Sequence, residues 1–135
     1  MVNEIESSIV ARLDAELDSV DVRAFPSSAE EYRKLPLGKS RILVAYAGSV
    51  FSEPTNRDTI VQEQVLEFEI TIQVRNLRGH DGAYPFLDSV YTALSGYSPL
   101  NDSRVLYAVS EKLTDYDNNV WTWQQVWQIS ERRAG

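Results

Sequence analysis

The only histidine of the chain is the first place to look for chemistry. His80 is followed by Asp81, and the pair stands between Gly79 and Gly82 in the stretch VRNLRGHDGAYPFLDSVYTAL. In a Ser-His-Asp mechanism the acid orients the imidazole through one ring nitrogen while the other nitrogen faces the nucleophilic serine. Side chains of adjacent residues point apart, and no G-x-S-x-G motif supplies the serine. We therefore interpret the pair as structural, with Asp81 as the helix cap of the segment that begins near Gly82.

Two carboxylate patterns also have simpler structural interpretations. Glu67 and Glu69 share one face of a predicted strand, a spacing that could serve paired-carboxylate chemistry. Gln73 and Arg75 continue the same face, so an exposed polar sheet face explains the pattern without catalysis. The stretch TDYDNNV has the acids of a calcium loop but lacks its glycine, its length and its terminal glutamate, and it predicts a hairpin turn.

The sequence lacks the motifs of metal, phosphate and thiol chemistry. It has no cysteine, which excludes disulfides, thiolate zinc sites and a cysteine nucleophile. A single histidine would leave carboxylates to supply nearly every ligand of a transition metal. Neither G-x-x-x-x-G-K nor G-x-G-x-x-G occurs. We expect no catalytic residue, no metal and no cofactor, and therefore a protein that is not an enzyme.

Three tryptophans fall on one face of the last apolar segment. Trp121, Trp123 and Trp127 share odd positions with Ile129 in the stretch NVWTWQQVWQI. Because side chains of a strand alternate between its two faces, this row predicts the core face of a terminal strand. An interface with another protein is the alternative, since tryptophan is enriched at binding hot spots.

Length and charge narrow the class of protein. The chain has 135 residues, which predicts a single domain over residues 1–135 that can bury a core without a metal or a disulfide. The net charge is −7 and the 13 Lys and Arg residues are scattered, whereas nucleic-acid binding requires a basic patch. No apolar run approaches the roughly 20 residues of a membrane span. The opening MVNEIESSIV does not have the pattern of a secretion signal, and we expect none.

The opening segment has the periodicity of an amphipathic helix. Apolar residues recur every four positions among charged ones, which predicts a helix over residues 3–18 with Asn3 as its N-cap. The recurring residues are Ile5, Ile9, Leu13 and Leu17.

The clearest strand lies in the middle of the chain. In VLEFEITIQVRN the even positions from Leu66 to Val74 are apolar and the odd positions from Glu67 to Arg75 are polar, so one face is expected to be buried. Residues 49–59 are rich in turn-forming types and predict a loop or an extended hairpin arm. Weaker patterns predict strands over residues 21–25, 40–48, 103–113 and 119–129, a helical turn capped by Ser27 or Ser28, and a helix from Gly82 to Gly96.

This order of elements predicts an α+β fold. We expect two layers, with a mainly antiparallel sheet of four to five strands and two main helices packed on one face of it.

Taken in order, four stretches resemble one known family. They are IESSIVARLDAEL, SRILVAYAGSVFSEP, QEQVLEFEITIQVRNLRGHDGAYPFLDSVYTALSGYSP and LYAVSEKLTDYDNNVWTWQQVWQI. Together they are similar to the Mu-like phage tail protein family of myophages, prophages and phage-tail-like particles, which includes tail terminator and tail-completion proteins. The most specific part is VRNLRGHDGAY, with the helix and the stop at Gly96 and Tyr97 that follow it.

The resemblance implies a structural protein of virion assembly. Tail terminators form hexameric rings on the last ring of the tail tube, stop its polymerisation and offer a surface to the neck. The implied partners are further copies of the chain, the tail tube protein, and sheath and neck proteins, while DNA passes through the lumen without specific binding. The implied location is the head-proximal end of the tail, after synthesis in the cytoplasm of the bacterial host. The resemblance implies no membrane contact.

Four residues are the candidates for contact with a subunit or with the tube. Phe51 and Arg57 belong to residues 49–59, the arm that could reach an adjacent subunit. Arg75 and Arg78 lie in the turn before the second long helix. A ring of identical chains closes through heterologous contacts, in which one patch meets a different patch of the neighbour.

Two alternatives remain open at this stage. A neck or head-completion protein would share the same assembly character. A small enzyme or ligand-binding domain would instead use a pocket near His80, Asp81 and the tryptophans.

Overall fold

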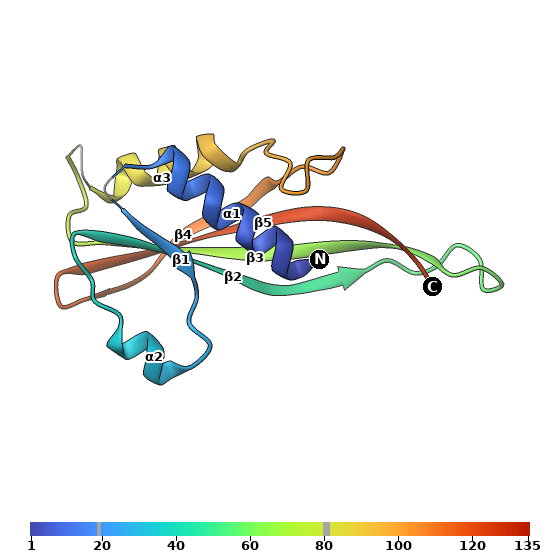
Figure 1. Cartoon of the computed structure of the whole chain (residues 1–135), viewed down its shortest axis with the longest axis horizontal. Coiled ribbons are helices and arrows are strands. Elements are labelled where there is room, and N and C mark those ends of the chain that lie inside the picture. The colour runs from blue at the N-terminus through green and yellow to red at the C-terminus, as the bar shows by residue number, and fades with distance from the viewer. Residues whose placement is uncertain (19, 80–81) are drawn as a thin grey trace.

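The chain folds into one twisted sheet with two helices packed on one side of it (Figure 1). The computed structural model describes residues 1–18, 20–79 and 82–135. In chain order the elements are α1 (Val2–Glu16), β1 (Asp21–Ala24), α2 (Ala29–Lys34), β2 (Ser40–Phe51), β3 (Val61–Val74), α3 (Ala83–Leu94), β4 (Tyr107–Asp117) and β5 (Val120–Ala134). The predicted α+β class and the order of elements are confirmed.

The sheet has five strands in the order β1-β2-β3-β5-β4. β1 pairs with β2 in parallel, and the other neighbours are antiparallel, so the sheet is mainly antiparallel as predicted. β3 lies in the middle, between β2 and β5. Its even side chains from Leu66 to Val74 are buried, and most of its odd side chains are half-buried, as the alternation predicts for a strand with one core face.

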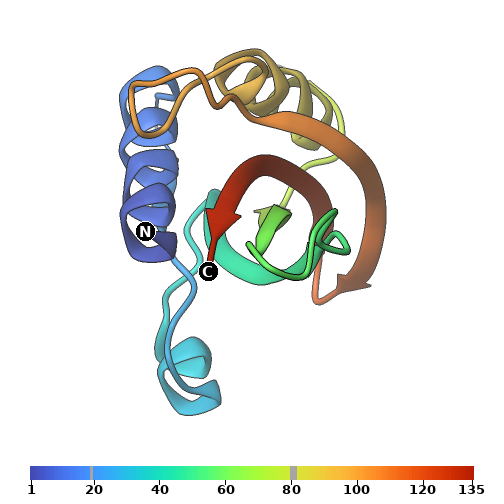
Figure 2. The same ribbon diagram turned by 90° about the vertical axis from the view of Figure 1, so that its right-hand side faces the viewer.

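The core lies between this face of the sheet and the helices α1 and α3. Ile5, Ile9 and Leu13 of α1 are fully buried, because a spacing of four residues keeps them on one side of the helix. α3 contributes five buried residues: Ala83, Leu87, Val90, Ala93 and Leu94. Figure 2, viewed from the end of the molecule, shows α1 and α3 together around the outside of the strongly twisted strands. Burial of each large apolar side chain stabilises the fold by about 1.5–3 kcal/mol.

The predicted limits of the first helix are wrong at both ends. α1 has Met1 as its N-cap, and the N–H of Ile5 donates to the carbonyl of Met1 at 3.0 Å, so Asn3 lies inside the first turn. The helix ends at Glu16 because Leu17 adopts an extended conformation. Leu17 is still buried, and it closes the apolar row beyond the end of the helix. No described helix has the length and apolar character of a membrane span.

The short helix α2 lies away from α1 and α3, as Figure 1 shows. Ser28 is its N-cap and accepts a hydrogen bond from the N–H of Glu31 at 3.1 Å, which confirms one of the two predicted caps. Tyr32 covers the guanidinium of Arg41, whose carbon lies 5.1 Å from the ring centroid. Arg41 is only 6% exposed, and its Nε donates to Oε1 of Gln73 at 2.6 Å. α2 thereby shields a polar cluster on the side of the sheet that carries the odd residues of β3.

The hairpin of β2 and β3 extends beyond the helices as an arm, defined here as residues 45–66 (Figure 1). β2 continues to Phe51, so the expectation of a strand ending at Gly48 is wrong, and the connecting loop covers only residues 52–60. Ser49, Val50 and Phe51 each pair with a residue of β3. β3 begins at Val61, before the alternating stretch that predicted it. Its backbone N–H and C=O groups offer hydrogen bonds to residues 49–51, and this pairing outweighs the weak strand signal of those residues.

β4 and β5 form a second hairpin with a tight turn at Asn118 and Asn119. Both asparagines have left-handed φ angles, 51° and 61°, which a two-residue type I′ turn requires. The predicted hairpin turn is confirmed. Trp127 of β5 is completely buried and Trp123 is half-buried on the same face, which confirms the core interpretation for this part of the tryptophan row.

The turn before α3 supplies acceptors to the start of that helix. The N–H groups of Ala83 and Tyr84 donate to the carbonyls of Asn76 and Leu77, at 2.9 and 3.1 Å. The chain packs so tightly here that a Cβ on Gly82 would overlap the carbonyl oxygen of Arg78. At the other end of α3, Gly96 has a φ of 76°, as predicted for the residue that ends this helix.

Gly82→Ala should therefore destabilise the protein by about 1–3 kcal/mol, because a methyl group is forced into backbone atoms that cannot rotate away. Gly38→Ala is the matched control, since a Cβ there meets nothing within 4 Å, and it should change stability little. Urea unfolding of both variants measures the difference. Equal stability of the two variants would contradict the close packing at Gly82.

Candidate assembly surfaces

The turn between β3 and α3 contains several of the predicted site residues. His80 and Asp81 lie outside the described residues, so the cap assigned to Asp81 and the pocket assigned to the pair stay predictions. The described N-cap of α3 is Gly82. Within the described part of the chain, no group of three or more His, Asp or Glu side chains is arranged to hold a metal ion.

Arg75, a predicted contact residue, binds the backbone of its own chain. Its Nε donates to the carbonyl of Gly38 at 2.9 Å, and its Nη2 donates to the carbonyl of Leu37 at 3.2 Å. The side chain thereby holds the connection between α2 and β2 against the end of β3. A partner would have to compete for these donors, so the role that the structure gives Arg75 is to hold its own chain.

Arg78, the second predicted arginine, lies on the surface beside α3. Its guanidinium carbon is 5.7 Å from the ring centroid of Tyr84, which is itself 43% exposed. A cation over an aromatic face is a weak attraction at an exposed site, about 0.5–1 kcal/mol. Arg78 and Tyr84 together offer a cationic and aromatic surface next to the turn.

The arm carries the other two predicted contacts, Phe51 and Arg57. Phe51 is 52% exposed and its neighbour Val50 is 70% exposed, at the last positions of β2. The backbone there is fixed, because the N–H of Ser52 donates to the carbonyl of Glu63 at 2.8 Å and the amide of Gln62 donates to the carbonyl of Ser52 at 2.8 Å. The arm therefore presents two apolar side chains from a rigid base.

The odd face of β3 is more enclosed than the predicted exposed polar face. Glu67 and Glu69 are half-buried, and each accepts a hydrogen bond from an amide of β5. Gln128 reaches Glu67 at 3.2 Å, and Gln124 reaches Glu69 at 3.0 Å. The two carboxylates thus belong to a ladder of acid and amide side chains across two strands, which accounts for them without catalysis.

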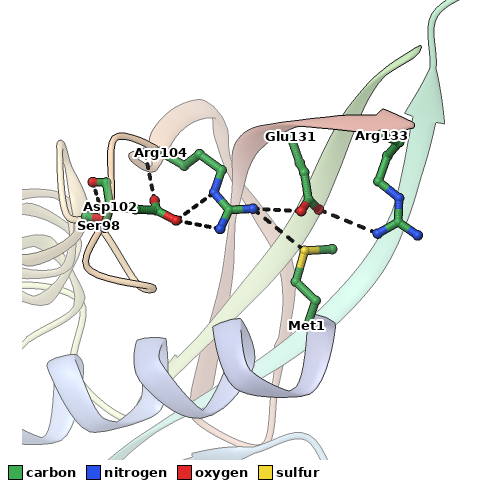
Figure 3. A network of polar contacts seen from close by, with 6 residues as sticks. All are labelled: Met1, Ser98, Asp102, Arg104, Glu131 and Arg133. Carbon is green, nitrogen blue, oxygen red and sulfur yellow. Dashed lines mark hydrogen bonds and ion pairs between the residues drawn. The ribbon is translucent and has the colours of Figure 1, made fainter. Parts of the chain in front are cut away.

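Arg104 is the centre of an ion-pair network that the sequence patterns did not indicate (Figure 3). Its Nε donates to Asp102 at 3.0 Å, and its Nη1 donates to Glu131 at 2.7 Å. The same Nη1 lies 3.9 Å from the sulfur of Met1. One side chain therefore contacts the loop after α3, the C-terminal part of β5 and the start of α1. The only sequence signal is an acid two residues before an arginine, which is too common to single out.

Hydrogen bonding within this network shifts two pKa values. The side chain and backbone N–H of Arg104 bind Asp102 and lower the pKa of its carboxyl, while the bond to Asp102 raises the pKa of Arg104. A lowered carboxyl pKa means that the stabilising contribution of Asp102 is present above its ordinary pKa of about 3.9 and is lost as the pH falls through the lowered value. The network is therefore intact at neutral pH.

The tryptophans pack against aromatic residues of their own chain. The rings of Trp123 and Tyr84 are 6.3 Å apart, and those of Trp127 and Tyr91 are 5.8 Å apart. Trp121 packs against Tyr116 with ring centroids 4.1 Å apart. This packing gives all three tryptophans a structural role at the junction of β5 with α3 and β4.

Comparisons with known proteins identify a family and a shared fold. A model of the Gp37 protein family matches residues 9–130. A search of the curated proteins found no significant match. Among solved structures, the chain is similar to a protein chain in the virion of a native gene transfer agent (GTA) particle. The TM-score is 0.51 at 14% sequence identity, over 94% of this chain and 84% of that one, so the likeness is one of fold.

Arg104→Met should destabilise the protein by about 1–3 kcal/mol, because it leaves the half-buried carboxylate of Glu131 without its closest cation. Oε2 of Glu131 is already buried without a hydrogen bond, and the nearest other cation, Arg133, is 3.9 Å away. Urea unfolding at neutral pH tests the change.

Arg23→Met is the control for this variant, since Arg23 also pairs with an acid two residues away but at an exposed site. It should cost less than about 0.5 kcal/mol. The double variant Arg104→Met, Glu131→Gln should recover part of the loss. If the two single arginine variants are equally stable, the network does not hold the three segments together.

Proposed function

The chain belongs to the Gp37 protein family, and on this premise we propose that it is a structural protein of a phage-type virion that acts by assembly and not by catalysis. The observation that carries the proposal is the fold, which is shared over nearly the whole chain with a component of a GTA virion. Internal contacts also support the proposal. The carboxylates of Glu67 and Glu69 accept hydrogen bonds from amides of β5, and the tryptophans pack on aromatic residues of their own chain.

Within the virion, the proposed role is that of a tail terminator. A ring of copies, expected to be a hexamer, would sit on the last ring of the tail tube at the head-proximal end. It would stop polymerisation and provide a surface for the neck. The family that the sequence resembles, the Mu-like phage tail proteins, supports this finer role, and the Gp37 match supports the broader one.

The exposed features of the molecule suit such a ring. The arm with Phe51 and the surface with Arg78 lie on different elements of the chain, as contacts between unlike patches require. The net charge of −7 opposes adhesion to DNA, so DNA could pass through a lumen without specific binding. Partners would be further copies, the tube protein, and the sheath and neck proteins.

A neck or head-completion protein is the nearest alternative. Such a protein would also assemble without catalysis, but its loss would leave tails of normal length beside unjoined heads. The length of the tail therefore separates the two roles.

Deleting the gene in a strain that produces the particle should give tails of abnormal and variable length, because nothing would end tube growth. Electron microscopy of lysates measures the length distribution. A plasmid copy of the wild-type chain should restore normal length.

An Ile9→Asp copy serves as the negative control, because it places a carboxylate in the fully buried core and should not fold or restore. Deletion lysates with tails of normal length that are joined to heads would overturn the terminator role. Tails of normal length without heads would instead support the neck role.

A further inference from the structure

A groove lies between α3 and the edge strand β4, away from the predicted contact residues. It is about 270 Å³ in volume and is lined by Tyr91, Ala108, Val109, Ser110, Glu111 and Gln125. Tyr91 and Val109 are about half exposed, at 52% and 51%, although both are large apolar side chains. Exposed apolar surface beside a concave site is typical of a binding surface.

The polar groups at the floor of the groove are engaged with one another. The amide nitrogen of Gln125 donates to Glu111 at 2.8 Å and to the carbonyl of Leu87 at 3.1 Å. The amide oxygen of Gln125 accepts from Nε1 of Trp127 at 2.9 Å. With these bonds made internally, the floor does not require a polar ligand, and the groove suits an apolar side chain.

The edge of β4 itself is poorly suited to strand addition. Its pairing with β5 is interrupted by irregularities after Ala108 and after Leu113, and Lys112 lies between them. Bulges and edge lysines are the features by which sheets block pairing with a further strand. The edge of β4 therefore disfavours an added strand, and the groove is better matched to a single side chain.

The arm carries a side chain of this kind. Phe51 is an exposed aromatic residue on a rigid base, next to Val50. Its own chain cannot bring it to the groove, because β3 and β5 separate β2 from β4 in the sheet. Three steps between strands span about 14 Å, and paired strands cannot slide sideways.

Charge also matches between the two surfaces. Arg57 lies in the loop at the end of the arm, and no described carboxylate is within ion-pairing distance of it. Glu111 at the groove has no described cation partner, and its hydrogen bond comes from a neutral amide. The arm thus carries a cation in its loop, and the groove carries an acid among its lining residues.

We propose that the groove between α3 and β4 binds Phe51 from the arm of a second copy of this chain. The contact joins unlike patches, so each copy offers one arm and one groove, and repetition around a common axis closes a ring. The aromatic anchor supplies most of the affinity, and Arg57 with Glu111 supplies orientation. The inference rests on the proposed function and identifies the partner surface of the arm.

Disulfide trapping tests the contact, because the native chain has no cysteine. The double variant Phe51→Cys, Val109→Cys should form a ladder of cross-linked multimers under mild oxidation, which reductant removes. Each single variant can form no more than a dimer. Phe51→Cys, Leu113→Cys is the matched control, since Leu113 is similarly exposed on the same strand but lies about 13 Å beyond Val109.

The trapping is done with concentrated purified protein and in lysates of the producing strain, where virion partners are present. A ladder in either setting that the control pair does not form supports the contact. No ladder in both settings, or an equal ladder from the control pair, overturns it. Phe51→Ser should lower the association constant at least tenfold in sedimentation while the unfolding midpoint stays unchanged, and unchanged association would also contradict the contact.

Tail length in the same strain gives an independent reading of the proposed function. A specific ladder together with unterminated tails would retain the contact and overturn the terminator role. Terminated tails without a ladder would retain the role and overturn the contact.

Discussion

The buried face of β3 is the constraint on which the rest of the molecule depends. Its row of apolar side chains from Leu66 to Val74 faces the helices, and strands pair with it on both sides. A slip of one residue would turn the whole row toward the opposite face, so the core fixes the register of β2 and β5 together. That register extends beyond the helices and gives the arm its rigid base.

Polar side chains stabilise the parts of the molecule that the apolar core does not reach. Arg104 joins the loop after α3 to the distal part of β5, and Arg75 joins β3 to the connection before β2. Glu67 and Glu69 bond amides of β5 on the other face of the sheet. Each such bond contributes only about 0.5–1.5 kcal/mol, but losing one partner of a half-buried pair costs more. Arg75 thus binds backbone carbonyls, and Arg104 binds carboxylates, of the same chain.

The same architecture keeps two exposed apolar surfaces apart. Val50 and Phe51 are exposed at the end of β2, and Tyr91 and Val109 are exposed between α3 and β4. The strands β3 and β5 separate β2 from β4 and keep the two surfaces apart. In the proposed contact, these apolar surfaces become buried when the arm of one copy enters the groove of another. In a ring built from such contacts between unlike patches, the angle between the arm and the groove determines the number of copies.

The sequence by itself determined the class of fold, the order of elements and the buried faces. Periodicities of two and four residues follow directly from strand and helix geometry, so β3 and α1 could be recognised from their apolar residues alone. The turn at Asn118 and Asn119 and the stop at Gly96 were equally local, because they depend on backbone conformations that few residue types adopt.

Only the tertiary structure decided what depends on residues far apart in the chain. The extension of β2 to Phe51 comes from pairing with β3, and no local pattern records that pairing. Arg104 and Glu131 are 27 positions apart, and the groove combines residues of α3, β4 and β5. Long-range contacts of this kind are set by the packing of whole elements, so the sequence could nominate Phe51 and Arg57 as contacts but not the surface that would receive them.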